Sequence, residues 1–192
     1  MAKQEKTKQV IAAGFKSLMN EKAFDKITVS DITSRCGLNR QTFYYHFQDK
    51  YDLFTWILQR EALISPKISL NIYNWSEAIY RTLSVMKRDR YFYINAFKSS
   101  GKEEFVLYLE QSMALSLKQI IADTSHRNMM NPGDRDFVIE FYTFGTVGII
   151  VDWILDGMKT SPEVLKERFE NLIVGTKSSS VDMWFSDGGQ NN

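Results

Sequence analysis

Cysteine and histidine are scarce in this chain, which has one cysteine and two histidines in 192 residues. The single cysteine, Cys36, excludes an intramolecular disulfide and is typical of a protein from a reducing compartment. Together with His46 and His126, it does not give the spacing of a His/Cys metal site or of a Cys–His catalytic pair. The sequence also lacks a glycine-rich phosphate-binding loop. We therefore expect no catalytic residues, no metal and no cofactor.

Long hydrophobic runs are missing as well. The longest apolar stretch, 141–151, lies between Glu140 and Asp152 and is shorter than the roughly twenty residues that cross a bilayer. Residues 1–8 are polar and mixed in charge, unlike a signal peptide. These features predict a soluble cytoplasmic protein with no membrane partner.

Charge is divided unevenly along the chain. Residues 1–50 contain nine basic and five acidic side chains, a net charge of +4, which leaves a net charge of −3 for the rest. Because phosphates attract basic surfaces, this division is expected if only the N-terminal part meets a nucleic acid. A chance imbalance is the alternative interpretation.

The segment that follows residue 27 carries the signals of two short helices joined by a glycine turn. Thr28 and Asp31 have the spacing of a capping box, which predicts a helix start at residue 29. Gly37 is suited to end that helix in the left-handed conformation, and Asn39 is suited to cap the next one. A helix-turn-helix of this kind presents its second helix to the major groove of DNA.

Segments 27–32, 37–47 and 49–53 together resemble the N-terminal signature of the TetR family of transcription regulators. Segment 141–162 is similar to regulators of dihydroxyacetone kinase operons within that family. The family resemblance implies a homodimer that binds double-stranded DNA. The subgroup resemblance implies an activator that receives its signal through a kinase-like partner protein.

Polar residues of the motif are the candidates for contacts with DNA. Arg40 suits bidentate binding to guanine, Gln41 suits adenine, and Thr42 offers a hydroxyl and a methyl group. Lys50, beside the amides at a helix start, is the strongest candidate for a phosphate contact. The complete predicted set is Thr28, Ser30, Arg40, Gln41, Thr42, Tyr44, Tyr45, His46 and Lys50. For the two tyrosines and the histidine, packing within the N-terminal part is the alternative.

Helical periodicity extends over most of the chain and predicts an all-α fold of about nine helices. Outside the motif, we expect helices near 6–20, 50–64, 74–87, 89–98, 102–124, 134–158 and 162–176. Pro66 disfavours helix at the residue before it and so ends or kinks the fourth helix. We divide the chain into a helix-turn-helix DNA-binding domain (1–50), a connecting helix (51–65), a regulatory and dimerisation domain (66–180) and a tail (181–192).

The expected helix at 134–158 is apolar on nearly every side in its middle. A helix of this kind must be buried all round, and Gly145 and Gly148 would permit close approach of another backbone. A symmetric contact with a second copy, completed by the helix at 162–176, explains both features, and a monomer core helix is the alternative. The predicted homodimer interface consists of Phe144, Gly145, Gly148, Ile149, Trp153, Leu165, Phe169 and Leu172. Such a dimer predicts a pseudo-palindromic operator.

Aromatic residues are frequent between residues 73 and 113. The TetR resemblance implies a small effector bound among the central helices, and an aromatic lining would suit an aromatic or amphipathic ligand. The predicted lining consists of Trp75, Tyr80, Tyr93, Phe97, Phe105, Tyr108 and Tyr142. The same spacing also fits plain hydrophobic core.

Two modes of regulation stay open: a repressor released by such a ligand, and an activator gated by a partner. A DNA-free adaptor is the third possibility, against which the polar turn 40–42 argues.

Overall fold

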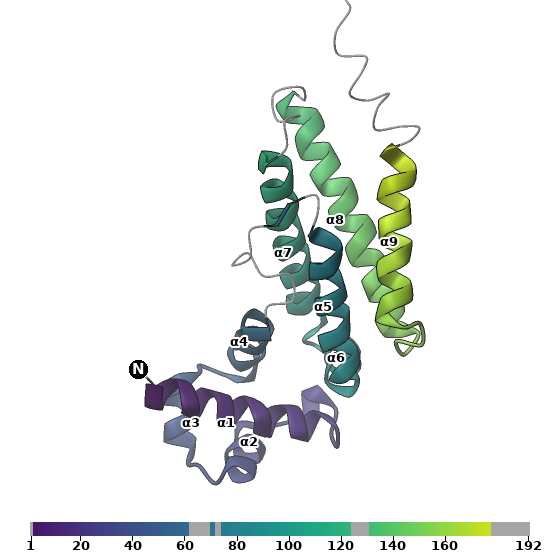
Figure 1. Ribbon diagram of the computed structural model, residues 1–192. Coiled ribbons are helices and arrows are strands. Elements are labelled where there is room, and N and C mark those ends of the chain that lie inside the picture. Colours follow the sequence, from purple (N-terminus) through teal and green to yellow (C-terminus); the bar gives the residue numbers. More distant parts are fainter. Residues whose placement is uncertain (1, 62–69, 72–73, 124–130, 178–192) are drawn as a thin grey trace, which may run out of the picture. The chain divides into compact units, whose positions relative to one another are not determined.

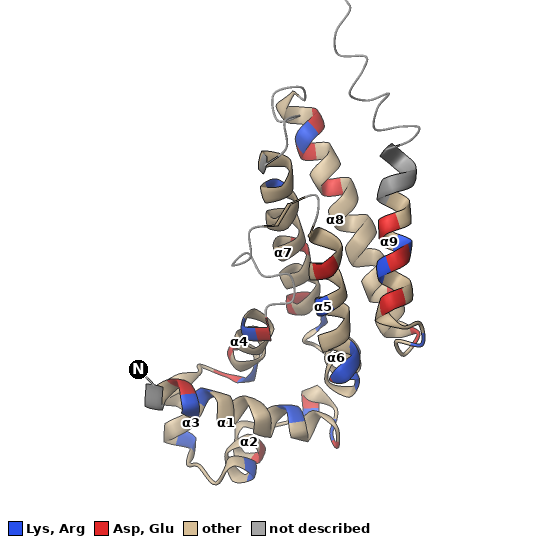
Figure 2. Cartoon of the chain, viewed as in Figure 1, with Lys and Arg blue, Asp and Glu red and all other residues tan. Residues whose placement is uncertain are grey.

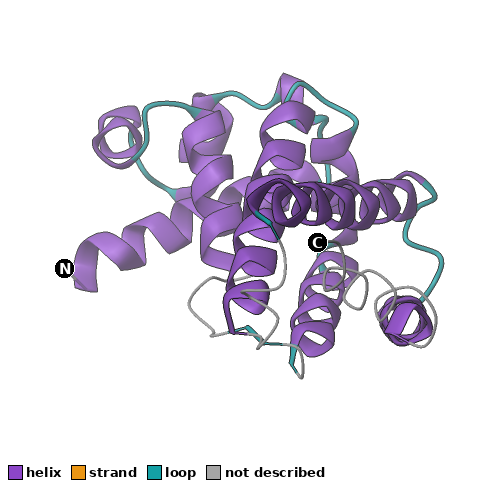
Figure 3. Ribbon diagram, turned by 90° about the horizontal axis from the view of Figure 1, so that it is seen from above, coloured by secondary structure: helices purple, strands orange, loops and turns teal. Residues whose placement is uncertain are grey.

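The computed structural model describes residues 2–61, 70–71, 74–123 and 131–177 (Figure 1). Within these ranges every regular element is a helix, which confirms the all-α prediction (Figure 3). The α-helices are α1 (Ala2–Met19), α2 (Val29–Cys36), α3 (Arg40–His46), α4 (Lys50–Glu61), α5 (Trp75–Arg88), α6 (Arg90–Phe97), α7 (Lys102–Asp123), α8 (Pro132–Leu155) and α9 (Pro162–Lys177). A short 3-10 helix, η1 (Phe24–Lys26), lies between α1 and α2.

The chain divides into two compact units. Unit 1 comprises residues 1–62 and 88–108, and unit 2 comprises residues 63–87 and 109–192. Helices α1 to α4 therefore share unit 1 with α6 and the first part of α7. The domain boundaries at residues 50, 65 and 180 describe a functional division and stay a prediction. The predicted tail and residue Pro66 lie outside the described residues.

Local capping explains where α2 and α3 begin and end. The Thr28 hydroxyl accepts a hydrogen bond from the Asp31 amide at 3.1 Å, and the Asp31 carboxylate accepts one from the Thr28 amide at 2.9 Å. Gly37 follows α2 in the left-handed conformation, with a φ of 63°. Asn39 Oδ1 then accepts from the Thr42 amide at 2.7 Å. The capping box, the glycine turn and the second cap are all confirmed.

Aromatic rings form the core of unit 1. Phe15 of α1 meets Phe24 and Phe92 edge to face, with ring centroids 5.8 and 6.3 Å apart. Phe54 of α4 contacts Phe92 at 5.6 Å and Phe105 at 6.2 Å. These side chains are fully buried. Because an aromatic pair adds about 0.5–1.5 kcal/mol beyond its buried area, the cluster fixes α6 against α1 and α4.

Asn95 of α6 holds the segment between α1 and α2. Its Nδ2 donates to the carbonyl oxygens of Met19 at 2.8 Å and Lys22 at 2.6 Å. Its Oδ1 accepts from the Phe24 amide at 2.9 Å. One side chain thus satisfies three backbone groups at the end of α1 and the start of η1. The N-terminal helices therefore depend on a residue that lies far along the sequence.

In unit 2, α5 and α9 are joined by polar contacts and α8 is joined to α9 by a short turn (Figure 1). Tyr80 of α5 donates to the Glu163 carboxylate at 3.0 Å, and Trp153 Nε1 donates to the Thr160 carbonyl at 2.8 Å. Helix α8 begins and ends earlier than predicted. Its start is set by Asn131, whose side chain accepts from the amide of residue 134 at 2.9 Å.

Candidate nucleic-acid interface

Helix α3 has one buried and one exposed face. Phe43 is fully buried and Phe47, which follows the helix, is nearly so. Arg40 and Gln41 are exposed on the other side, as are Tyr44 and Tyr45, whose exposed fractions are 50% and 70%. The two phenylalanines anchor the helix, and the outward face is left to polar groups. This is the arrangement that a recognition helix needs.

Arg40 and Tyr44 are in contact with one another. Arg40 Nη2 donates to the Tyr44 hydroxyl at 3.3 Å, and its Cζ lies 5.9 Å from the centroid of the tyrosine ring. Gln41, by contrast, has no hydrogen-bond partner for its side-chain amide among the described residues. The first turn of α3 thus exposes the guanidinium of Arg40, which is hydrogen-bonded to Tyr44, and the side-chain amide of Gln41, which has no partner among the described residues.

The hydroxyl protons of Thr28 and Thr42 are already used. Thr28 Oγ1 donates to Asp31 at 2.8 Å, and Thr42 Oγ1 donates to Asn39 at 2.9 Å. A phosphate accepts hydrogen bonds only, so it would have to compete with these caps for the same protons. Both residues keep a methyl group and oxygen lone pairs for other contacts. Ser30 is exposed at the start of α2.

Lys50 is committed to the interior of unit 1. Its Nζ donates to the carbonyl oxygens of Phe24 at 2.9 Å, Asp25 at 3.1 Å and Ile27 at 3.1 Å. An ammonium has three donors, and all three are engaged. In this geometry Lys50 is not available for the phosphate contact predicted for it. The sequence showed its position at a helix start but not the carbonyl groups of η1.

The first turns of α1 lie beside α3. Gln4 Nε2 donates to the Tyr45 hydroxyl at 2.8 Å. The His46 ring meets the Tyr45 ring edge to face at 5.0 Å. Burial and the neighbouring charge of Lys8 lower the pKa of His46, so the imidazole is neutral at pH 7. No local sequence pattern indicates this contact, because it joins residues 41 positions apart.

Several basic side chains near the motif are paired with acids. Arg35 binds both carboxylate oxygens of Glu21, at 2.9 and 2.6 Å, and Lys22 lies 2.8 Å from Asp31. Arg40 has no acidic partner in the described part of the chain. Figure 2 shows charges of both signs on helices α1, α2 and α4, whereas α3 has only the basic Arg40. The charges of Arg35 and Lys22 are therefore balanced by neighbouring acids, whereas the charge of Arg40 is not.

The residues predicted to line a ligand site are divided between the two units. Tyr93, Phe97 and Phe105 are buried in the aromatic core of unit 1. Trp75, Tyr80 and Tyr142 are half-buried in unit 2, and Tyr108 is half-buried in unit 1. The core interpretation thus fits the three residues of unit 1 that are fully enclosed.

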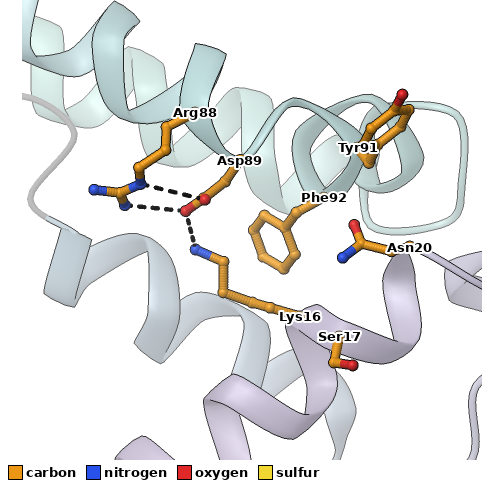
Figure 4. A pocket seen from close by; sticks show the side chains of 7 residues that line it. All are labelled: Lys16, Ser17, Asn20, Arg88, Asp89, Tyr91 and Phe92. Atoms are coloured by element: carbon orange, nitrogen blue, oxygen red, sulfur yellow. Dashed lines mark hydrogen bonds and ion pairs between the residues drawn. The ribbon is translucent and has the colours of Figure 1, made fainter.

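A small polar hollow of about 180 Å³ lies in unit 1 (Figure 4). It is lined by Lys16, Ser17, Asn20, Arg88, Asp89, Tyr91 and Phe92, none of which was predicted to bind a ligand. Asp89 pairs with both Lys16 and Arg88, and Lys16 also pairs with Glu61 outside the lining, so two carboxylates balance the two cations. Burial alone would raise the pKa of Asp89, but hydrogen bonds from these two cations hold it below its usual value.

Part of the predicted dimer surface is exposed and part is not. Phe144, Ile149 and Leu172 have exposed fractions of 60%, 42% and 55%. A Cβ atom added to Gly145 or Gly148 would meet nothing within 4 Å. Trp153, Leu165 and Phe169 were also predicted for the interface, but they are buried within the single chain. Their place in the dimer interface stays a prediction, and for Trp153 helical spacing alone does not tell which side of the all-apolar helix α8 its own chain covers.

The exposed side of α8 is strongly apolar. Phe137 and Phe141 continue the exposed row that includes Phe144. Figure 2 shows no charged segment in the stretch of α8 between Glu140 and Asp152. By length and composition, α8 is the one described helix that could also cross a membrane, although a third of its most apolar window is buried. No group of three potential metal ligands occurs among the described residues.

Two protein-family models match this chain, one in its N-terminal part and one in its C-terminal part. The model of bacterial regulatory proteins of the tetR family matches residues 11–56, and the model of a transcriptional regulator C-terminal region matches residues 73–175. The chain is 27% identical over 177 residues to the HTH-type dhaKLM operon transcriptional activator DhaS of Lactococcus lactis subsp. lactis, covering 91% of this chain and 92% of that relative.

Several solved structures have a fold similar to that of this chain. The dihydroxyacetone kinase operon activator DhaS superimposes with a TM-score of 0.72 at 25% identity, over 88% of this chain and 95% of that one. NalD of Pseudomonas aeruginosa, the secondary repressor of the MexAB-OprM multidrug efflux pump, gives 0.63 at 20% identity, over 85% and 92% of the two chains. A regulator from Streptomyces coelicolor gives 0.55 at 14% identity, over 94% and 95%. The last two likenesses concern the fold alone.

Proposed function

Because the chain belongs to the TetR family of bacterial transcription regulators, we propose that it binds a pseudo-palindromic operator as a homodimer. The observation that carries this proposal is the face of α3, where Arg40 and Gln41 stand exposed above a buried Phe43. A transcription regulator of this kind works in the cytoplasm on double-stranded DNA.

Two groups of residues divide the contacts with DNA. Arg40, Gln41 and Thr42 read base edges, and Thr42 does so through its methyl group because its hydroxyl proton caps α3. Contacts with the sugar–phosphate backbone fix the position of the helix. These contacts come from Ser30, Tyr44, Tyr45 and His46, and from Thr28 when a phosphate displaces Asp31 from its hydroxyl proton. Lys50 supports them from inside, since its three hydrogen bonds hold η1 in place.

The second copy covers the exposed row of phenylalanines on α8. Phe141 and Phe144 each expose more than half of their surface, and burying such a side chain contributes about 1.5–3 kcal/mol. Leu172 of α9 and the open positions at Gly145 and Gly148 extend the same contact. A two-fold dimer sets two α3 helices about 34 Å apart, one turn of DNA, or a small multiple of that distance.

The similarity to DhaS supports a more specific role. That relative is named an activator of the dhaKLM operon, and it matches this chain over nearly its whole length. We extend its role to this chain as an activator of a dihydroxyacetone kinase operon. The signal then comes from a kinase-like partner protein. In favour of a partner, Tyr93, Phe97 and Phe105, which were predicted to line a ligand site, are buried and contact one another in the core of unit 1.

A binding and transcription assay tests this function. Purified protein is titrated onto duplexes from its own upstream region and from upstream of any dihydroxyacetone kinase genes, at low salt. We expect binding that weakens steeply with added salt, because phosphate contacts release counterions. In a reconstituted transcription assay, an activator raises the yield of transcript. A fall in yield that a small aromatic or amphipathic ligand reverses would favour the repressor instead. No binding to any fragment would favour the DNA-free adaptor.

A further inference from the structure

We propose that Tyr44 is a positioning residue for base recognition: it holds the guanidinium of Arg40 on the exposed face of α3 before DNA is bound. Arg40 then selects its base pair from a prearranged position. This role deepens the proposed function and rests on it.

The contact between the two side chains has two components. Four residues separate them, so they lie on the same face of α3. Arg40 Nη2 donates to the Tyr44 hydroxyl at 3.3 Å, and the guanidinium carbon lies 5.9 Å from the ring centroid, within reach of a cation–π interaction. The Tyr44 ring in turn rests edge-on against Phe43, with centroids 5.6 Å apart. Because Phe43 is fully buried, the core of unit 1 supports the orientation of Arg40 through two rings.

Among the described residues, Tyr44 is the one side chain in contact with that of Arg40. Arg40 is the first residue of α3, where the helix dipole is unfavourable for a cation. The described residues offer it no carboxylate, whereas Arg35 is bound by both oxygens of Glu21. A tyrosine is neutral, so it restrains Arg40 without cancelling its charge. The full positive charge of Arg40 therefore remains available to DNA.

The donors of Arg40 and the hydroxyl of Tyr44 allow this contact to persist in the complex. A guanidinium has five N–H groups, and the tyrosine hydroxyl uses one of them. Bidentate recognition of guanine needs two more. The hydroxyl accepts the hydrogen bond from Arg40 and so keeps its own proton for a phosphate oxygen. Tyr44 thus joins the backbone contact to the base contact.

The expected size of the effect follows from side-chain freedom. An arginine side chain that moves freely before binding loses rotamer freedom when it contacts a base. Holding it in the binding position beforehand reduces that loss. Removing the restraint should lower discrimination at the base pair read by Arg40 by about three- to tenfold. Base pairs read by other residues should keep their discrimination.

The test uses the full chain and duplexes that the wild-type protein selects from a random pool, together with every single base-pair substitution in the selected sequence. Tyr44→Phe removes the hydroxyl and keeps the ring. Tyr45→Phe is the matched control, since it removes the same atom from a neighbouring exposed tyrosine that is bonded to Gln4 instead. Both variants are also examined in an Arg40→Ala background, and thermal unfolding confirms that each is folded.

We expect Tyr44→Phe to reduce discrimination at one base pair, whereas Tyr45→Phe, which removes a proposed backbone contact, should lower affinity evenly at all positions. In the Arg40→Ala background this position-specific effect should vanish. A Tyr44→Phe variant that lowers affinity equally at every position, with or without Arg40, would show a phosphate contact alone and overturn the positioning role. A wild-type protein that selects a sequence and a Tyr44→Phe variant with an unchanged profile would overturn it as well. Only a wild-type protein that selects no sequence would refute the proposed function, and this role with it.

Discussion

Two helices of this chain expose aromatic side chains, and the two exposed faces differ in chemistry. On α3 the exposed rings are Tyr44 and Tyr45, whose hydroxyls take part in hydrogen bonds with Arg40 and Gln4. On α8 they are phenylalanines, of which Phe141 and Phe144 lie in a stretch without charge. Water can solvate the first face but not the second. The first therefore suits a polar, charged partner such as DNA, and the second suits an apolar partner such as another copy of α8.

The apolar face should respond most strongly to a buried charge. We expect Phe144→Asp to raise the dissociation constant of the dimer by about a hundredfold or more, because two phenylalanines leave the interface of a symmetric dimer and two carboxylates enter it. Sedimentation velocity at micromolar concentration measures the change. Leu107→Asp, at an exposed leucine of α7, is the control and should leave the dimer intact. Equal behaviour of the two variants would place the dimer contact elsewhere.

Lys50 supports the polar face from inside and can be replaced without changing any exposed side chain of α3. Lys50→Met keeps most of the aliphatic stem but leaves three carbonyl oxygens without their donor, and each such loss costs about 1–3 kcal/mol where water cannot replace it. One of the three hydrogen bonds is exposed and the other two are only part-buried, so water offsets part of this cost, and we expect a total loss of about 2–3 kcal/mol in the free energy of unfolding, measured with urea. Lys26→Met, at an exposed lysine of η1, should change it little. If Lys50 instead contacts a phosphate, Lys50→Met should reduce the slope of the logarithm of the binding constant against the logarithm of the salt concentration by about one.

Gln41 allows the polar face to be changed at a single point. Gln41→Ala should relax the preference at one base pair by about 1–3 kcal/mol and leave the dimer unchanged. Fluorescence anisotropy with single base-pair substitutions gives the profile. Gln59→Ala, an exposed glutamine of α4, serves as the control. Affinity lost evenly over all positions would show that Gln41 touches the backbone rather than a base.

Asp89 contributes to stability without belonging to either face. Its pKa is lowered in the folded chain, so its contribution is fully present above its ordinary pKa of about 3.9 and is lost as the pH falls through the lowered value. Asp89→Asn should therefore cost about 1 kcal/mol at pH 7 and progressively less in acid. Urea unfolding at a series of pH values measures this, with Asp136→Asn of α8 as the control. A cost that does not change with pH would point to packing rather than charge.

The sequence predicted best those features that depend on neighbouring residues. Thr28 with Asp31, Gly37, and Asn39 each act within four positions of their partners, so spacing alone indicated the ends of α2 and α3. The polar outer face of α3 followed from the same local pattern.

Features that depend on distant residues were missed or misread. The three carbonyl groups bound by Lys50 lie 23 to 26 positions away, and Asn95 acts across more than 70. Neither contact has a local signal. Trp153 was placed on the dimer surface because α8 is apolar all round, and periodicity cannot divide such a helix between its own chain and a partner. Only the packing of unit 2 makes that division.

The mass of the protein–DNA complex is the measurement that bears most directly on the joint use of the two faces. Sedimentation of the wild-type protein with a duplex it has selected, at low salt, should give two chains on one duplex. The Phe144→Asp variant should bind the same duplex far more weakly. A wild-type protein that stays monomeric at micromolar concentration and binds none of the duplexes would contradict both the dimer and the recognition helix.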